Sequence, residues 1–430
     1  MFGRKTVESC ATVIPRILIV GAILVVGRFN AVSCADYQER TAVLAPTRLD
    51  WTFAVNSRSL NQPLPEWLGD YRSAQQYYQC YIPHQSAPPQ GYPAIVFISA
   101  SASPTGWAQW QKICRGEQVI FASPYDAGNE CPIKQRIRAV FDVVDDLRRR
   151  DRLDPDRMYL AGISGGARVA CMIGFALPEY FGGLMPICAG GELRQERWLW
   201  QRLSDRMSVA YITGEDDFNR AEVERYRTPV LQAMHVRTRL WVVPGMGHTI
   251  ADESVLREAY QWMEVGLRSR RELAQRWPAS REAPDGARDR QTWSEVLFAE
   301  ALQRLAQPEL VFSGLMQLKG VMNRWPDLPA AKKCKATLAD YGQRQNRPWV
   351  KTDLDEKRSH RVAEARAAAD FATGQLIGPY ANSRAKYAKA ALDKWRDILD
   401  RHPEGALLEE VRRRIAELKE LNSDSPAKSQ

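Results

Sequence analysis

Residues 76–270 alternate between short apolar runs and longer amphipathic stretches. Runs rich in β-branched and aromatic residues, bounded by Gly, Pro, Ser and Asp, predict strands. These strands are expected over 77–82, 94–98, 118–122, 158–161, 184–188, 209–213 and 239–243. Residues 133–150 instead place apolar side chains three and four positions apart, which indicates an amphipathic helix. Strands that alternate with helices predict a mostly parallel sheet that is covered on both faces.

The pattern changes after residue 271. A stretch with Pro and Gly over 278–286 predicts a linker, and the sequence beyond it is helical in pattern and rich in Ala, Leu, Arg, Lys and Glu. Six positions between Leu315 and Pro326 match six between Leu392 and Pro403, at a constant offset of 77 residues. Each copy predicts a helix, a turn that ends at proline, and a second helix. One such hairpin cannot bury its apolar face alone, so it must stack on a neighbour.

A chain of 430 residues is long for one domain, so we expect two domains and flanking segments. The predicted parts are a signal peptide over 1–35, an irregular segment over 36–75, an α/β domain over 76–272, a linker over 273–290 and a smaller all-α helical-hairpin domain over 291–430.

The first 35 residues have the pattern of an export signal. Basic residues precede an apolar run over 17–26, which is short for a membrane span, and small residues over 33–35 offer a cleavage site. We therefore expect an exported protein (periplasmic, secreted or envelope-associated) without a stable transmembrane span. An uncleaved anchor and a poor lipoprotein-type site at Cys34 remain alternatives.

The net charge of +9 invites a comparison with nucleic-acid-binding proteins, but the two signs of charge interleave. Arg148, Arg149 and Arg150, for example, are followed at once by Asp151. We interpret such runs as solvated helix faces and expect no nucleic-acid partner. A basic surface could still help adhesion to acidic polysaccharide or anionic lipid.

Six of the eight cysteines would remain after the predicted cleavage. An even count in an exported protein permits disulfides, and Cys114 with Cys131 is the first pair to test. Buried free thiols are the alternative. The sequence has no Cys-x-x-Cys or His-Glu-x-x-His spacing, so we expect no metal and no other cofactor.

The sequence Gly-Ile-Ser-Gly-Gly over 162–166 lies between a predicted strand and a predicted helix. In this setting a Gly-x-Ser-x-Gly pattern indicates a nucleophile elbow, since the tight turn requires small neighbours and exposes the serine hydroxyl above the sheet. The start of the helix also points N–H groups at the reacting oxygen. Ser164 is therefore the candidate nucleophile.

A serine nucleophile needs a base and an orienting carboxylate. Three acidic residues at 215–217 follow the strand over 209–213, and His248 follows the strand over 239–243. Open α/β sheets place their sites at these carboxyl ends of strands. The order Ser, Asp, His along the chain is that of the α/β-hydrolases.

This constellation, with Ala-Gly-Ile-Ser-Gly-Gly-Ala-Arg at 161–168, resembles the α/β-hydrolase superfamily. Within it the chain looks most like the exported esterases near polyhydroxybutyrate depolymerases and feruloyl esterases, over residues 75–270. The resemblance implies an α/β-hydrolase sheet flanked by helices. It also implies that Ser164 is the nucleophile, His248 the general base and Asp217 the orienting acid.

The choice of Asp217 follows from the family's spacing, which commonly places the acid three residues after a glycine, here Gly214. Asp216 and Glu215 remain possible substitutes.

Family members usually carry a His-Gly pair after an early strand, where it helps to form the oxyanion hole. Here the strand over 94–98 runs into Ser-Ala-Ser-Ala-Ser-Pro. We expect the Gly165 N–H to be one donor and the N–H of Ala100 or Ser101 to be the other. The departure leaves the position of the second donor open.

The helical hairpins resemble tetratricopeptide repeats, which implies a module that binds a protein partner or docks on the hydrolase domain. Taken together, the sequence predicts an exported serine hydrolase that cleaves a small-molecule, polysaccharide-linked or polyester ester. Two alternatives stay open: an interaction scaffold whose hydrolase domain is inactive or weakly active, and a serine peptidase.

Overall fold

The computed structural model describes residues 37–63, 65–194, 196–226, 231, 236–276, 289–343, 349–376 and 378–423. The predicted signal peptide over 1–35 and most of the predicted linker over 273–290 lie outside these residues.

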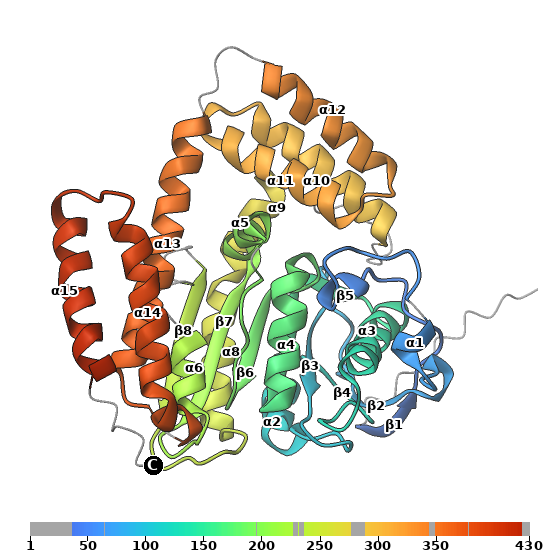
Figure 1. The fold of residues 1–430 in the computed structure, drawn as a ribbon. Coiled ribbons are helices and arrows are strands. Elements are labelled where there is room, and N and C mark those ends of the chain that lie inside the picture. Colours follow the sequence, from blue (N-terminus) through green and yellow to red (C-terminus); the bar gives the residue numbers. More distant parts are fainter. Residues whose placement is uncertain are drawn as a thin grey trace, which may run out of the picture. The chain divides into compact units, whose positions relative to one another are not determined.

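The strands of the described residues form one eight-stranded sheet in the order β1-β2-β4-β3-β5-β6-β7-β8 (Figure 1). Its strands are β1 (Gln38–Ala42), β2 (Tyr77–Tyr81), β3 (Tyr92–Ile98), β4 (Ile120–Pro124), β5 (Leu153–Ile163), β6 (Gly183–Ile187), β7 (Ser208–Gly214) and β8 (Arg237–Val243). The pairs β1–β2 and β2–β4 are antiparallel, and the pairs from β4 to β8 are parallel. The prediction of an α/β-hydrolase sheet flanked by helices and followed by helices is confirmed.

The expectation of an irregular segment over 36–75 differs from the structure at β1, which pairs with β2 at the edge of the sheet. Its sequence, Gln-Glu-Arg-Thr-Ala, is mostly exposed and has no alternation of apolar and polar residues that would indicate a strand. Long-range contacts hold the edge instead. The Arg150 guanidinium donates to the Ala42 carbonyl at 2.6 Å, and the Leu44 N–H donates to Asp146 at 2.8 Å.

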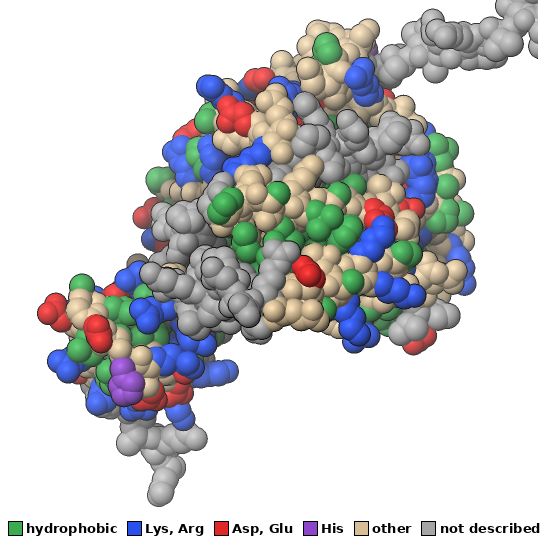
Figure 2. Space-filling view, turned by 90° about the horizontal axis from the view of Figure 1, so that it is seen from above, with side chains coloured by type: hydrophobic (Ala, Val, Ile, Leu, Met, Phe, Trp, Pro, Cys, Tyr) green, Lys and Arg blue, Asp and Glu red, His purple; other side chains and the backbone are tan. Residues whose placement is uncertain are grey.

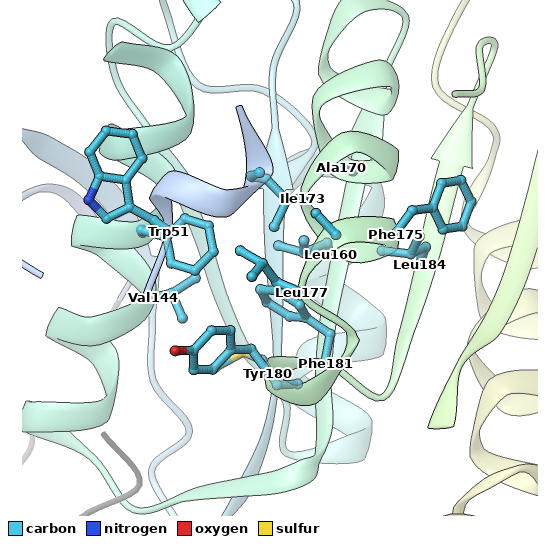
Figure 3. Packing of buried hydrophobic residues seen from close by; sticks show 14 of the residues in the cluster. Trp51, Val144, Leu160, Ala170, Ile173, Phe175, Leu177, Tyr180, Phe181 and Leu184 are labelled. Atoms are coloured by element: carbon cyan, nitrogen blue, oxygen red, sulfur yellow. The ribbon is translucent and has the colours of Figure 1, made fainter. Parts of the chain in front are cut away.

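Helices cover both faces of the parallel strands, so β3 is buried along its whole length. Ile95 and Phe97 pack with α2 (Trp107–Glu117) and α8 (Glu253–Val265), while the alternate residues face α3 (Ile133–Arg150) and α4 (Gly165–Ala176). Figure 3 shows this second layer, where Val144, Leu160 and Ile173 from α3, β5 and α4 lie together.

The described residues after β8 are mostly helical. Their longer helices, with α8, are α9 (Leu267–Arg276), α10 (Arg290–Leu305), α11 (Val311–Arg324), α12 (Pro329–Gln343), α13 (Trp349–Thr373), α14 (Arg384–Leu399) and α15 (Gly405–Ser423). The two sequence repeats correspond to the hairpins α11–α12 and α14–α15, each with its proline in the turn. Their relation to tetratricopeptide repeats stays a prediction.

A buried ion cluster joins α11 to the α/β part. Arg324 contacts Asp50 at 2.9 Å and Glu179 at 2.6 Å, and all three side chains are fully buried. The Trp325 indole N–H also donates to Asp50, at 2.8 Å. Trp293 and Leu318 belong to the same apolar core as α3 and α4, and residues 35–430 form one compact unit. The boundaries predicted from sequence at 272 and 290 therefore stay predictions.

Figure 2 shows Lys and Arg side chains spread over one face of the molecule with Asp and Glu side chains among them. In the described part of the chain, each helix is too short or too polar to cross a bilayer. The six described cysteines are free thiols, so the predicted Cys114–Cys131 pair is not bonded.

Replacing Arg324 with alanine leaves two buried carboxylates without their cation. We expect the free energy of unfolding to fall by about 3–5 kcal/mol. Arg401 is the matched control, because it occupies the equivalent position 77 residues later, but its side chain is 52% exposed and pairs with Asp397 at 2.9 Å. Arg401→Ala should change the free energy by less than about 0.5 kcal/mol. Urea unfolding followed by tryptophan fluorescence makes the comparison, and equal losses in both variants would contradict it.

Candidate active site

Ser164 occupies the turn between β5 and α4 with φ 53° and ψ −119°. L-residues rarely adopt such a positive φ, and a serine held there between a strand and a helix is typical of a nucleophile elbow. The Ser164 N–H donates to the Ile187 carbonyl at 2.9 Å, and its own carbonyl accepts from the Arg168 N–H at 3.1 Å. The half-buried side chain therefore stands on a backbone that is fixed on both sides.

The glycines of the elbow are required by close packing. A Cβ on Gly166 would lie 1.9 Å from the Ile98 carbonyl oxygen, and one on Gly162 would lie 2.6 Å from the Gly166 carbonyl carbon. The backbone of α4 at Gly166 is therefore in direct contact with the backbone at the end of β3. This contact brings the N-terminus of α4, and Gly165 with it, to the loop that follows β3.

Asp217 and His248 are brought together by the turns after β7 and β8. His248 Nδ1 lies 2.7 Å from Asp217 Oδ1. The carboxylate is fully buried, and it also accepts from the Thr213 hydroxyl at 2.7 Å and from the Asn219 N–H at 2.9 Å. A carboxylate on Nδ1 selects the tautomer that leaves Nε2 available as a base.

Glu215 and Asp216, the other candidates for the orienting acid, have no hydrogen bond to His248 among the described residues. Both residues are exposed, and the described hydrogen bonds of His248 go to Asp217. The Phe218 ring, missed by sequence reasoning, stacks on the His248 imidazole with ring centroids 4.0 Å apart, and it is 56% exposed. A large apolar side chain that remains exposed beside an imidazole offers a contact surface for an apolar group of a ligand.

Ser164, Asp217 and His248 follow β5, β7 and β8, which are neighbours at one edge of the parallel sheet together with β6. The hydrogen bonds of the described residues do not include one between the Ser164 hydroxyl and His248. Such bonds are often long before a substrate binds. The three residues are related by the neighbouring carboxyl ends of β5, β7 and β8 and by the Asp217–His248 bond.

Of the two N–H groups considered after β3, the Ser101 N–H donates to the Ser99 hydroxyl oxygen at 3.1 Å. In the part of the chain that the structure describes, the N–H groups of Ala100 and Gly165 donate to no protein acceptor. Gly165 is the first residue of α4, where backbone N–H groups have no partner within the helix. Ala100 and Gly165 are therefore the donors that this geometry leaves for a ligand.

Cys188 directly follows β6 with φ 56° and is fully buried. Its Sγ, a carboxylate oxygen of Asp217 and a ring nitrogen of His248 lie within 4.8 Å of one another. Burial, and next the charge of Asp217, raises the pKa of the Cys188 thiol to about 12. A metal would need the thiolate, and both carboxylate oxygens already accept hydrogen bonds. The three residues therefore fit a hydrogen-bonded cluster better than a metal site.

No family model and no curated relative matches the chain. Solved structures similar to it include a thermostable esterase, at 20% identity and a TM-score of 0.36, covering 47% of this chain and 60% of that one. Another is the S-formylglutathione hydrolase FrmB from Staphylococcus aureus, at 14% identity and a TM-score of 0.37, covering 47% of this chain and 94% of that one. A ferulic acid esterase matches at 14% identity and a TM-score of 0.34, covering 45% of this chain and 92% of that one. These likenesses assign no residue, substrate or partner to this chain.

The raised pKa of Cys188 gives a pH-dependent prediction. The thiolate is the form that reacts with iodoacetamide, so Cys188 should stay unmodified between pH 7 and pH 9 and begin to react only as the pH approaches its pKa. Cys131 is only partly buried and should be modified first. Peptide mass spectrometry at a series of pH values measures both rates in one sample. If Cys188 reacts as fast as Cys131 at pH 8, the environment described for its thiol is wrong.

Proposed function

We propose that this protein is an exported serine hydrolase that cleaves carboxylic esters with Ser164, His248 and Asp217. The observation that carries the proposal is the 2.7 Å contact between His248 and a fully buried Asp217, at the sheet edge where Ser164 is held at a positive φ. A buried carboxylate and a serine at positive φ each lower the stability of the fold unless their surroundings stabilise them. Together they correspond to what acyl transfer by a serine requires.

In the proposed acylation step, Ser164 Oγ forms a bond to the ester carbonyl carbon while His248 Nε2 takes the hydroxyl proton. The carbonyl oxygen becomes an oxyanion in the tetrahedral intermediate. The bond to the alkoxy oxygen then breaks, and the imidazolium returns its proton to the leaving alcohol. Water repeats the sequence on the acyl-enzyme, which releases the acid and restores Ser164.

Asp217 orients the imidazole throughout. Its bonds from Thr213 and Asn219 hold the carboxylate in place, and it stabilises the imidazolium that forms in each half of the reaction. The N–H groups of Gly165 and Ala100 are the proposed donors to the oxyanion. Removing one such donor costs about a hundredfold to a thousandfold in kcat in acyl-transfer enzymes.

The C-terminal helices contact the helix that follows the acid. Glu222 of α6 (Arg220–Tyr226) accepts two bonds from Arg168 in the first turns of α4, at 2.9 and 2.6 Å, and one from the Tyr380 hydroxyl at 3.2 Å. Phe371 also packs on Ala221. These contacts support docking of the helical region on the hydrolase part as its proposed role, and a separate protein partner remains an additional proposal.

A fluorophosphonate probe tests the proposal without knowledge of the substrate. It should label Ser164 in the native protein, because only a serine activated by a base reacts. Ser164→Ala should remove the label, and His248→Ala should reduce it strongly. Ser57→Ala, at an exposed loop serine, is the matched control and should label like the wild type. No label on the folded wild type would favour the scaffold alternative.

A second prediction separates the candidate acids. Asp217→Asn should lower kcat on a p-nitrophenyl ester by roughly a thousandfold to ten-thousandfold, because the amide stabilises the wrong imidazole tautomer. Asp216→Asn makes the same chemical change at the neighbouring exposed residue and should leave kcat within about twofold. Steady-state kinetics of both variants decides, and a loss confined to Asp216→Asn would assign the acid to Asp216.

A further inference from the structure

Arg136 of α3 is a buried cation with neutral partners. Its side chain lies beneath the loops that follow β3 and β4, and the residue is only 4% exposed. The guanidinium donates to the Ala127 carbonyl, to the Ser99 carbonyl at 2.6 Å and to Asn129 Oδ1 at 3.1 Å. Among the described residues, no carboxylate lies within ion-pair distance of it. Burial lowers the pKa of Arg136 to about 10, so the group still carries its charge at neutral pH.

Asn129 lies beside both proposed oxyanion donors. Its own N–H donates to the Ala100 carbonyl at 2.8 Å, which ties the loop after β4 to the loop after β3. A Cβ on Gly165 would lie 1.9 Å from Asn129 Oδ1 and 3.2 Å from Asn129 Nδ2. The amide group of Asn129 is thus packed against the residue that immediately follows the nucleophile.

The contact with Arg136 fixes the orientation of that amide. A guanidinium has only donors, so it must face the oxygen of Asn129, and the nitrogen with its two N–H groups lies on the other side. In the described part of the chain these two N–H groups donate to no protein acceptor, and the residue is exposed. An amide nitrogen without a protein acceptor, on an exposed residue packed against Gly165, is available to a ligand.

We propose that Asn129 Nδ2 donates a hydrogen bond to the oxyanion of the tetrahedral intermediate, as a third donor beside Gly165 and Ala100. This inference rests on the proposed ester hydrolysis. It also accounts for the Ser-Ala-Ser sequence after β3, in which the His-Gly pair of similar esterases is absent.

Arg136 contributes to this role in two ways. It orients the amide, and its charge polarises the amide so that the N–H groups become stronger donors. A buried positive charge without a carboxylate partner also favours negative charge nearby, which develops only in the transition state. The arrangement therefore stabilises the transition state more than the bound ester.

The experiment compares Asn129→Ala and Asn129→Asp with the wild type on a p-nitrophenyl ester. Asn129→Asp keeps the size of the side chain and the oxygen facing Arg136, but it replaces the donor with an anionic acceptor. We expect kcat to fall about a hundredfold in Asn129→Ala, and further in Asn129→Asp, with KM changed less than about threefold. Asn382→Asp, at an exposed residue of the C-terminal region, is the matched control and should keep the wild-type kcat.

Binding of a trifluoromethyl ketone separates a donor from a structural role, because this inhibitor forms an oxyanion on the active serine. Its affinity should fall by the same factor as kcat/KM in both variants. The melting temperature should fall in Asn129→Ala, because the buried Arg136 loses an acceptor, but not in Asn129→Asp, whose carboxylate still accepts from Arg136. An unchanged inhibitor affinity, a loss of kcat in Asn129→Asp that is matched by a lower melting temperature, or a kcat within threefold of the wild type in both Asn129 variants would each overturn the inference.

Failure of the proposed function gives a different result. In that case the wild type itself would neither hydrolyse the ester nor react with the fluorophosphonate. An active, labelled wild type whose Asn129 variants are equally active would overturn the role of Asn129 and leave the ester hydrolase proposal standing.

Discussion

The hydrogen bond between His248 and the buried carboxylate of Asp217 is the interaction on which the proposed chemistry depends. A carboxylate without water must be stabilised by its neighbours, and Thr213 and Asn219 supply two of the donors. These donors lie on β7 and on the turn after it, so the acid is fixed by the sheet. The imidazole is then fixed by the acid. A proton relay built in this way needs no reorganisation when charge moves through it.

The same edge of the sheet also holds the strained backbone of Ser164. Such strain persists only where the surrounding packing over-determines it. Here the close approach of Gly166 to the end of β3, and the hydrogen bond from Ser164 to Ile187, provide that constraint. A core that is buried on both faces of β3 and β5 makes the edge rigid. The packing of the core therefore also stabilises the strained backbone at Ser164.

Local spacing predicted the parallel strands, the turn at Ser164 between a strand and a helix, and the positions of Asp217 and His248 after their strands. The edge strand β1 carried no such signal, since its residues are polar and its pairing comes from distant contacts. In the sequence, Arg324 is one of the six repeat positions between Leu315 and Pro326. Its partner Asp50 is 274 residues away, and no local pattern encodes a pair of that separation.

The residues around the oxyanion position were hidden for the same reason. Arg136 reads as one basic residue on an amphipathic helix, and Asn129 as one polar residue in a turn. Only the fold brings their contact beside Gly165. The sequence does carry one weak indication of a role for Asn129. It lies in the loop after β4, and open α/β sheets place their sites at the carboxyl ends of parallel strands.

The most direct test of this account is a crystal structure of the protein after reaction with a small alkyl fluorophosphonate. The account predicts phosphorus bonded to Ser164 Oγ, with one phosphoryl oxygen accepting from the N–H groups of Gly165 and Ala100. It also predicts His248 Nε2 within hydrogen-bond distance of Ser164 Oγ, with Nδ1 still on Asp217. An adduct on another residue, or an imidazole that cannot reach the serine in the adduct, would contradict it.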